Sequence, residues 1–258
     1  MSRVDSQDLL SLRTGQKFRR FERLGISNDL RRILRDSKNS DWSEGKTYAR
    51  DLIIRDVLNR FGRKGHNLRM LTLPGPYWIF EKIMLRKFRQ SRQITFIGVE
   101  RAKQLFRLAA STMPKTNKPL KCSHNTTTGG HKISNGKNAV LIHANVHQML
   151  LDDDLHDESF DAIWLDLSSP ITEKVIQSII RIGEGNKIRR PGYLALTLQA
   201  SRESLATMRL IEQDGGRSSL LRGLMADIFG EAANETHFHR YGNNNQMIQI
   251  GFNIGVQP

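Results

Sequence analysis

Two acidic residues stand at the ends of apolar runs that are typical of buried strands. Glu100 follows residues 94–99, Ile-Thr-Phe-Ile-Gly-Val, and Asp166 closes residues 160–166, Phe-Asp-Ala-Ile-Trp-Leu-Asp. Ligands bind outside the carboxyl ends of the strands in open α/β sheets, where a carboxylate can accept hydrogen bonds from both hydroxyl groups of a ribose. We therefore predict that Glu100 binds a ribose and that Asp166 lies at the same edge. The alternatives are a helix N-terminal acid for Glu100 and a helix N-cap cluster for Asp166.

Alternating strands and helices must position these residues. The patterns predict strands at residues 68–73, 94–99, 139–144, 161–165 and 193–198, helices at 46–61, 78–88, 101–111, 172–182, 204–211 and 220–229, and a polar loop at 112–137. Residues 237–241 and 247–254 flank a Gly-Asn-Asn-Asn turn, which predicts an antiparallel hairpin. Parallel strands need crossover helices, so this order predicts an α/β Rossmann-like fold with a mostly parallel sheet.

This order of elements resembles that of class I S-adenosylmethionine-dependent methyltransferases over residues 46–258. The resemblance implies S-adenosylmethionine as the cofactor. It also implies that Asp166 is catalytic and orients the methyl acceptor or accepts its proton. The cofactor contacts that it implies are Thr72, Leu73, Pro74, Gly75, Glu100, Arg101, Asn145, Val146 and Asp166. Asn145 suits adenine because its amide donates and accepts hydrogen bonds, although asparagine is also common in turns.

The sequence departs from the family pattern in its first loop. Leu73-Pro74-Gly75-Pro76 can turn tightly, because proline fixes φ and glycine permits a positive φ. The loop nevertheless has one glycine rather than three, and no acidic residue ends the strand before it. An ordinary turn between a strand and a helix is the alternative.

The loop after the fourth strand bears on the type of methyl acceptor. Residues 166–170, Asp-Leu-Ser-Ser-Pro, loosely resemble the Asp/Asn-Pro-Pro-aromatic loop of amino-group methyltransferases and the Asp-containing loop of RNA methyltransferases. The Lys-Asp-Lys-Glu set of ribose 2′-O-methyltransferases is not supported. Asp166 and Lys64 could supply two members, but Gln199-Ala200-Ser201-Arg202 after the fifth strand offers no lysine.

Positive charge is concentrated in the first half of the chain. The net formal charge is +14, yet residues 1–121 contain 28 Lys and Arg against 11 Asp and Glu, whereas residues 122–258 contain 12 against 15. Such asymmetry is typical of a surface that meets a polyanion, most often nucleic acid. We predict phosphate contacts from Arg19, Arg20, Arg31, Arg32, Arg35, Lys64, Arg86 and Lys87. An anionic membrane and a solvated basic surface without a partner are the alternatives.

The remaining features narrow the class of protein. No apolar run is long enough for a transmembrane helix or a signal peptide. The single cysteine favours a reducing, cytoplasmic compartment, and no histidine spacing indicates a metal site. We expect a basic helical segment at residues 1–60 and a methyltransferase-like domain at residues 61–258. Two functions fit: methyl transfer to RNA or DNA, and nucleic-acid binding by a catalytically inactive relative. A partner protein or a homo-oligomer is left open for both.

Overall fold

Helix α4 (Glu44–Phe61) is the first element that the computed structural model describes. The chain divides between Ser43 and Glu44 into two units, so α4 belongs to the same unit as the sheet. The sequence prediction had grouped residues 44–60 with the N-terminal segment. The described residues are 44–61, 67–87, 94–114, 121–124, 131–136, 138–151, 159–167, 169–200, 203–242, 244 and 246–255. Within them, no helix is both long and apolar enough to cross a membrane.

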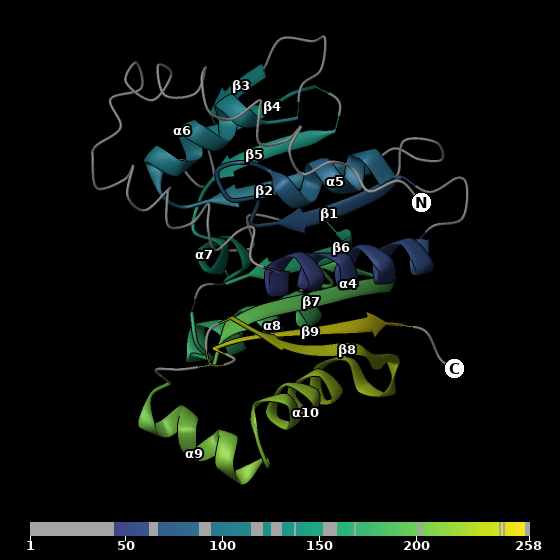
Figure 1. The fold of residues 1–258 in the computed structure, drawn as a ribbon, viewed down its shortest axis with the longest axis vertical. Coiled ribbons are helices and arrows are strands. Elements are labelled where there is room, and N and C mark those ends of the chain that lie inside the picture. The colour runs from purple at the N-terminus through teal and green to yellow at the C-terminus, as the bar shows by residue number, and fades with distance from the viewer. Residues whose placement is uncertain are drawn as a thin grey trace. The chain divides into compact units, whose positions relative to one another are not determined.

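The described residues form one nine-stranded sheet. Its strands are β1 (Leu68–Thr72), β2 (Ile94–Glu100), β3 (Lys121–His124), β4 (His131–Ser134), β5 (Ala139–His143), β6 (Phe160–Asp166), β7 (Ile188–Gln199), β8 (Ala233–Tyr241) and β9 (Met247–Ile254). They lie in the order β3-β4-β5-β2-β1-β6-β7-β9-β8 (Figure 1). The central strands β5, β2, β1, β6 and β7 are parallel, so their carboxyl ends meet at one edge. Strands β9 and β8 complete the sheet as an antiparallel pair, and the predicted fold class is confirmed.

Helices cover both faces of the sheet with apolar residues. Helices α4, α5 (Ile79–Lys87) and α6 (Lys103–Thr112) share one core, in which Ile53, Ile54 and Val57 of α4 are buried. Helices α7 (Val146–Leu151), α8 (Glu173–Glu184), α9 (Leu205–Gln213) and α10 (Arg217–Phe229) contribute to the other core. Helix α8 shows why such segments are helical, because its buried residues Val175, Ile179 and Ile182 recur at helical spacing. A 3₁₀ turn, η1 (Gly230–Ala232), leads into β8.

Several elements differ from the sequence prediction. The polar loop expected at residues 112–137 contains β3 and β4, which pair with each other and extend the sheet beside β5. Their sequences, Lys-Cys-Ser-His and His-Lys-Ile-Ser, lack the apolar alternation by which strands are detected. Helix α7 was missed because it has only six residues. Strand β7 begins at Ile188 rather than Tyr193, and a register shift opposite Phe160 and Ala162 accommodates Pro191.

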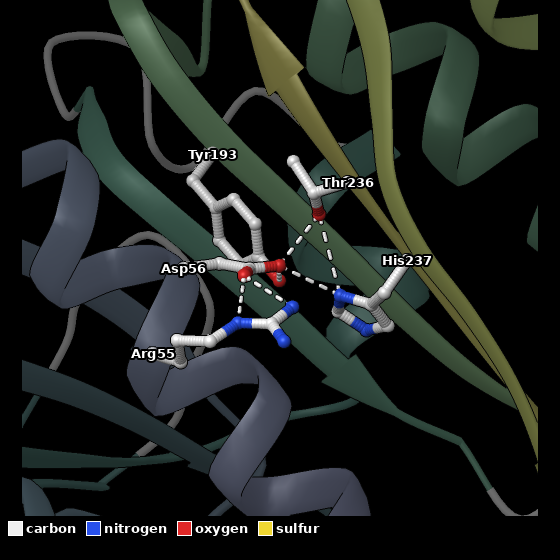
Figure 2. A network of polar contacts seen from close by, with 5 residues as sticks. All are labelled: Arg55, Asp56, Tyr193, Thr236 and His237. Carbon is white, nitrogen blue, oxygen red and sulfur yellow. Dashed lines mark hydrogen bonds and ion pairs between the residues drawn. The ribbon is translucent and has the colours of Figure 1, made fainter.

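A polar network centred on the buried Asp56 connects α4 to β7 and β8 (Figure 2). Asp56 Oδ2 accepts a hydrogen bond from Thr236 Oγ1 at 2.6 Å, lies 2.7 Å from His237 Nδ1, and accepts a longer bond of 3.4 Å from the Tyr193 hydroxyl. Asp56 Oδ1 accepts two hydrogen bonds from the Arg55 guanidinium, at 2.9 and 3.0 Å. The network therefore joins α4 to β7 and β8, which lie far along the chain.

Asp56 is ionised in this network, which fixes the direction of its hydrogen bonds. Burial alone would raise the pKa of Asp56, but hydrogen bonds from His237, Thr236 and Arg55 outweigh burial and lower that pKa to about 2. Because an ionised carboxylate can only accept, His237 Nδ1 is the donor. A second bond, from Arg60 Nη2 to Ile254 O at 2.7 Å, holds the end of α4.

Candidate active site

The first loop, residues 73–78, folds back onto the neighbouring strand. A Cβ on Gly98 of β2 would lie 2.8 Å from Pro74 Cγ and 2.8 Å from Trp78 Cη2, so both side chains pack on this glycine. Trp78 is fully buried with φ at 52°, and its Nε1 donates to Ala109 O at 2.8 Å. Gly75 has φ at +58°, and, apart from its chain neighbours, no described residue places an atom within 4 Å of the position of a Cβ there. The loop is thus packed on one side and open at Gly75.

The residues that lead into this loop are mostly covered. Thr72, at the end of β1, is fully buried, and its hydroxyl has no hydrogen-bond partner among the described residues. The Leu73 side chain packs against the apolar core on the other face of the sheet. The Leu73 side chain is therefore partly occupied by core packing, whereas the Thr72 hydroxyl lies buried at the strand end.

The ends of β2 and β5 lie side by side. Glu100 Oε1 accepts a hydrogen bond from Ala102 N at 2.8 Å, and Ala144 N donates to Glu100 O at 3.2 Å. Burial raises the pKa of Glu100, although the backbone N–H groups of Ala102 and Arg101 counter part of this effect. Asn145 follows Ala144, and its Oδ1 accepts from His147 N at 3.0 Å. Glu100 and Asn145 are therefore neighbours at the carboxyl edge.

Asp166 forms an ion pair that links β6 to α4. Its Oδ2 lies 3.2 Å from Lys46 Nζ, and the side chains of Asp166 and Lys46 are only 15% and 20% exposed. Lys46 stands in the first turn of α4, and Asp166 is the last residue of β6. A carboxylate and an ammonium group therefore meet where parallel strands present ligands.

Polar side chains continue from Asp166 across the sheet. Asp166 is in register with Thr197 of β7, Thr197 with Gln249 of β9, and Gln249 with His239 of β8. Residues directly opposite each other on neighbouring strands share a face of the sheet. Gln249 is fully buried, and neither its amide oxygen nor its amide nitrogen has a hydrogen-bond partner within the described ranges. A polar row therefore leads from Asp166 into the half of the sheet that α4 contacts.

Helix α4 reaches both ends of this row. Lys46 pairs with Asp166 at one end, and the Tyr48 ring meets the His239 ring edge-on at the other, with centroids 4.8 Å apart. His239 also stacks on Tyr241, with centroids 5.6 Å apart. Tyr48 is 53% exposed. An aromatic side chain is thus open to solvent two residues from Lys46.

Comparison with known proteins identifies the fold. No protein-family model and no curated protein matches the sequence. The structure of the plantazolicin methyltransferase BpumL with a triazolic desmethylPZN analog and SAH matches with a TM-score of 0.54 at 10% identity, over 90% of this chain and 93% of BpumL. An S-adenosylmethionine-dependent methyltransferase from Clostridium acetobutylicum gives 0.51 at 9% identity, over 89% and 99% of the two chains. The CurJ carbon methyltransferase gives 0.55 at 7% identity, over 83% of this chain and 56% of CurJ. The fold is that of the class I methyltransferases.

This methyltransferase fold brings several predicted site residues together at the carboxyl edge of the parallel strands. They are Thr72 and the first loop, Glu100, Asn145 and Asp166. The Val146 side chain is buried in the core and Arg101 is exposed beside Glu100. Among the described residues, no group of three His, Cys, Asp or Glu side chains could hold a metal ion.

The predicted phosphate contacts divide into two groups. Arg86 and Lys87 are exposed in the last turn of α5, and Lys87 Nζ lies 3.5 Å from Asp51 Oδ1 of α4. The others lie outside the described residues: Arg19, Arg20, Arg31, Arg32, Arg35 and Lys64.

Sequence reasoning missed Lys46 and Gln249. Lys46 stands 120 positions from Asp166, and nothing in its local pattern marks it as the partner of that carboxylate. Gln249 did leave a signal, because a buried strand of the sequence Met-Ile-Gln-Ile-Gly-Phe has one amide among apolar residues. The lysine that the sequence prediction considered as a partner of Asp166 was Lys64, which lies outside the described residues.

Proposed function

We propose that this protein transfers a methyl group from S-adenosylmethionine to a nucleic acid. The observation that carries the proposal is the ion pair between Lys46 and Asp166 at the carboxyl end of β6, within a methyltransferase fold. Asp166 orients the acceptor hydroxyl or amino group by accepting its hydrogen bond. Lys46 holds the Asp166 carboxylate in position through their ion pair.

The residues at the carboxyl edge fit the proposed cofactor. BpumL, which has the same fold, is seen with SAH, the demethylated product of S-adenosylmethionine. In this chain, Glu100 offers a half-buried carboxylate to the ribose hydroxyls, and Asn145 offers an amide to the adenine. The space beside Gly75 lets the backbone of the first loop approach a ligand. When bound, S-adenosylmethionine supplies the electrophilic methyl group. The protein supplies mainly the positions of donor and acceptor.

Charge and an exposed aromatic residue support a nucleic-acid acceptor. The excess of Lys and Arg in residues 1–121 favours contact with phosphates. Arg86 and Lys87 are exposed members of this set. Tyr48, beside Lys46 on α4, presents a ring on which a base can stack. These features together favour a nucleic acid over an uncharged small acceptor.

Calorimetric titration with S-adenosylmethionine and SAH tests the proposal first. Binding of both compounds, followed by transfer of a radiolabelled methyl group to RNA or DNA, is the expected result. If neither compound binds at millimolar concentration, the proposed enzymatic function is wrong.

Replacement of Glu100 tests the ribose contact. Glu100→Ala should weaken SAH binding by roughly 1–3 kcal/mol, the effect of losing a charged hydrogen-bond partner. Burial raises the pKa of Glu100, so this carboxylate takes up a proton at a higher pH than an exposed glutamate does. The affinity for SAH should therefore also fall as the pH decreases through that pKa, because the protonated carboxyl group carries no charge. Isothermal titration at several pH values measures both effects. Glu173→Ala, at an exposed position in α8, is the matched control, and equal affinities for the two variants would contradict the ribose assignment.

A second candidate function is nucleic-acid binding without catalysis. The packing of Pro74 and Trp78 on Gly98 favours this function. A first loop that lies against β2 leaves less room for a cofactor at the strand ends. The calorimetric titration separates the two functions.

Both candidate functions predict salt-dependent binding to nucleic acid. For a duplex oligonucleotide, log K should fall linearly with log salt concentration, and the double variant Arg86→Gln/Lys87→Gln should reduce the slope by about 2. Fluorescence anisotropy over a salt series measures the slope. Lys174→Gln, an exposed change on α8 of the opposite face, is the control. A slope that the double variant does not change would exclude Arg86 and Lys87 from the interface.

A further inference from the structure

Glu81 of α5 is a fully buried acid in the interior of the domain. It is 1% exposed, and neither carboxylate oxygen has a hydrogen-bond partner among the described residues. An ionised carboxylate without a partner is costly to bury, so natural proteins keep such a group only where another group satisfies it.

The surroundings of Glu81 place it at the end of β1. Burial raises the pKa of Glu81 to about 7, and the backbone N–H of Glu81, the Thr72 hydroxyl, the Arg50 guanidinium and the Lys82 ammonium each counter part of that effect, so these groups lie close to the carboxyl group. Thr72 is the last residue of β1, and its buried hydroxyl is also without a hydrogen-bond partner in the described part of the chain. Two buried polar groups, from β1 and α5, therefore converge beside the first loop.

We propose that Glu81 binds the ammonium group of the amino-acid portion of the cofactor, with the Thr72 hydroxyl beside it. This inference rests on the proposed function. The cofactor carries an ammonium and a carboxylate group in that portion, and an ammonium group needs an anionic acceptor when it leaves water. Strand β1 ends in Thr72 rather than in an acid, so the strand itself offers no anion. Glu81, one turn into the helix that follows the first loop, supplies the charge from α5 instead.

This assignment predicts that cofactor binding depends on pH. A carboxyl group whose pKa is about 7 carries its proton about half of the time at neutral pH. An ammonium ligand favours the ionised form, so ligand binding should release a proton from Glu81. The affinity should therefore rise as the pH increases from about 6 to about 8.

The experiment compares ligands with and without the amino-acid portion. Wild-type protein and Glu81→Gln are titrated calorimetrically with SAH, with its decarboxylated amine analogue, and with methylthioadenosine, which lacks the ammonium group. We expect Glu81→Gln to bind SAH and the amine analogue roughly 10- to 100-fold more weakly than wild type, with no change for methylthioadenosine. Glu184→Gln, an exposed change at the end of α8, should bind all three compounds as wild type does.

A second measurement does not depend on a variant. Titration of wild-type protein with SAH in two buffers of different ionisation enthalpy should reveal proton release at pH 7, and the release should be absent with methylthioadenosine. Equal losses for all three ligands in Glu81→Gln, or no proton release in the wild type, would overturn this inference alone. Failure of the wild type to bind any of the three compounds would overturn the proposed function together with it.

Discussion

Asp166→Asn is expected to lower the rate of methyl transfer by about 10²- to 10⁴-fold, the range that positioned acid–base groups contribute. Asparagine keeps the size of the side chain but cannot take a proton and carries no charge to pair with Lys46, which lies 3.2 Å away. The affinity for SAH should change much less than the rate, because we propose that Asp166 acts on the acceptor. Single-turnover transfer of a radiolabelled methyl group measures the rate, and calorimetry measures the affinity.

Two further variants test whether the loss of rate is specific to the ion pair between Lys46 and Asp166. Lys46→Met should also lower the rate, because it breaks the same ion pair, whereas Asp227→Asn at an exposed position in α10 should leave the rate unchanged. An unchanged rate in Asp166→Asn would exclude this residue from the chemistry. A loss of SAH binding that matched the loss of rate would reassign Asp166 to cofactor binding.

Asp56→Ala is expected to destabilise the folded protein by about 3 kcal/mol, because it leaves buried donors without an acceptor. Thr236, His237 and Tyr193 all donate to one oxygen of Asp56 (Figure 2), and the side chains of Tyr193 and His237 are buried. Urea unfolding followed by circular dichroism measures the loss. The matched control is Asp51→Ala on the same helix, since the pair between Asp51 and Lys87 is exposed and surface pairs of this kind contribute about 0–1 kcal/mol.

The acid stability of the protein provides an independent check on Asp56. The pKa of Asp56 is about 2 in the folded protein, against an ordinary value of 3.8, so the folded state binds fewer protons than the unfolded state in this range. Asp56 therefore stabilises the fold by about 2 kcal/mol above pH 4, and this contribution is lost as the pH falls from about 4 to about 2. Unfolding curves of the wild type should show this loss, and those of Asp56→Ala should lack it. Parallel acid limbs in the two proteins would show that the network does not depend on the charge of Asp56.

The sequence predicted the fold well where local pattern determines structure. The parallel strands were visible because strands buried on both faces are continuous apolar runs, as in residues 94–99. Glu100 and Asp166 were found because each directly follows or closes such a run. The small polar strands β3 and β4 were not predicted, because they are strands by virtue of their hydrogen bonds to each other and to β5, which the local sequence does not reveal.

The contacts of α4 could not be predicted from the sequence. Lys46 approaches Asp166, and Asp56 approaches His237, across more than 100 residues of intervening chain. Periodicity reports which side of a helix is buried, but it does not report which distant strand lies beneath that side. Glu81 was overlooked for a similar reason, since an acid in the first turn of a helix is ordinary in sequence and is unusual only when burial is known.

The anchoring of α4 bears on the order in which the protein assembles during synthesis. Helix α4 leaves the ribosome before β1, yet its partners Thr236, His237 and Ile254 are 180, 181 and 194 residues away from the α4 residues that bind them. Elements that emerge early and dock late make contacts of high sequence separation, which form slowly. The contacts of Asp56 and Arg60 with β8 and β9 can therefore form only after the final strands have been translated, so a nascent chain without these strands lacks this anchor of α4.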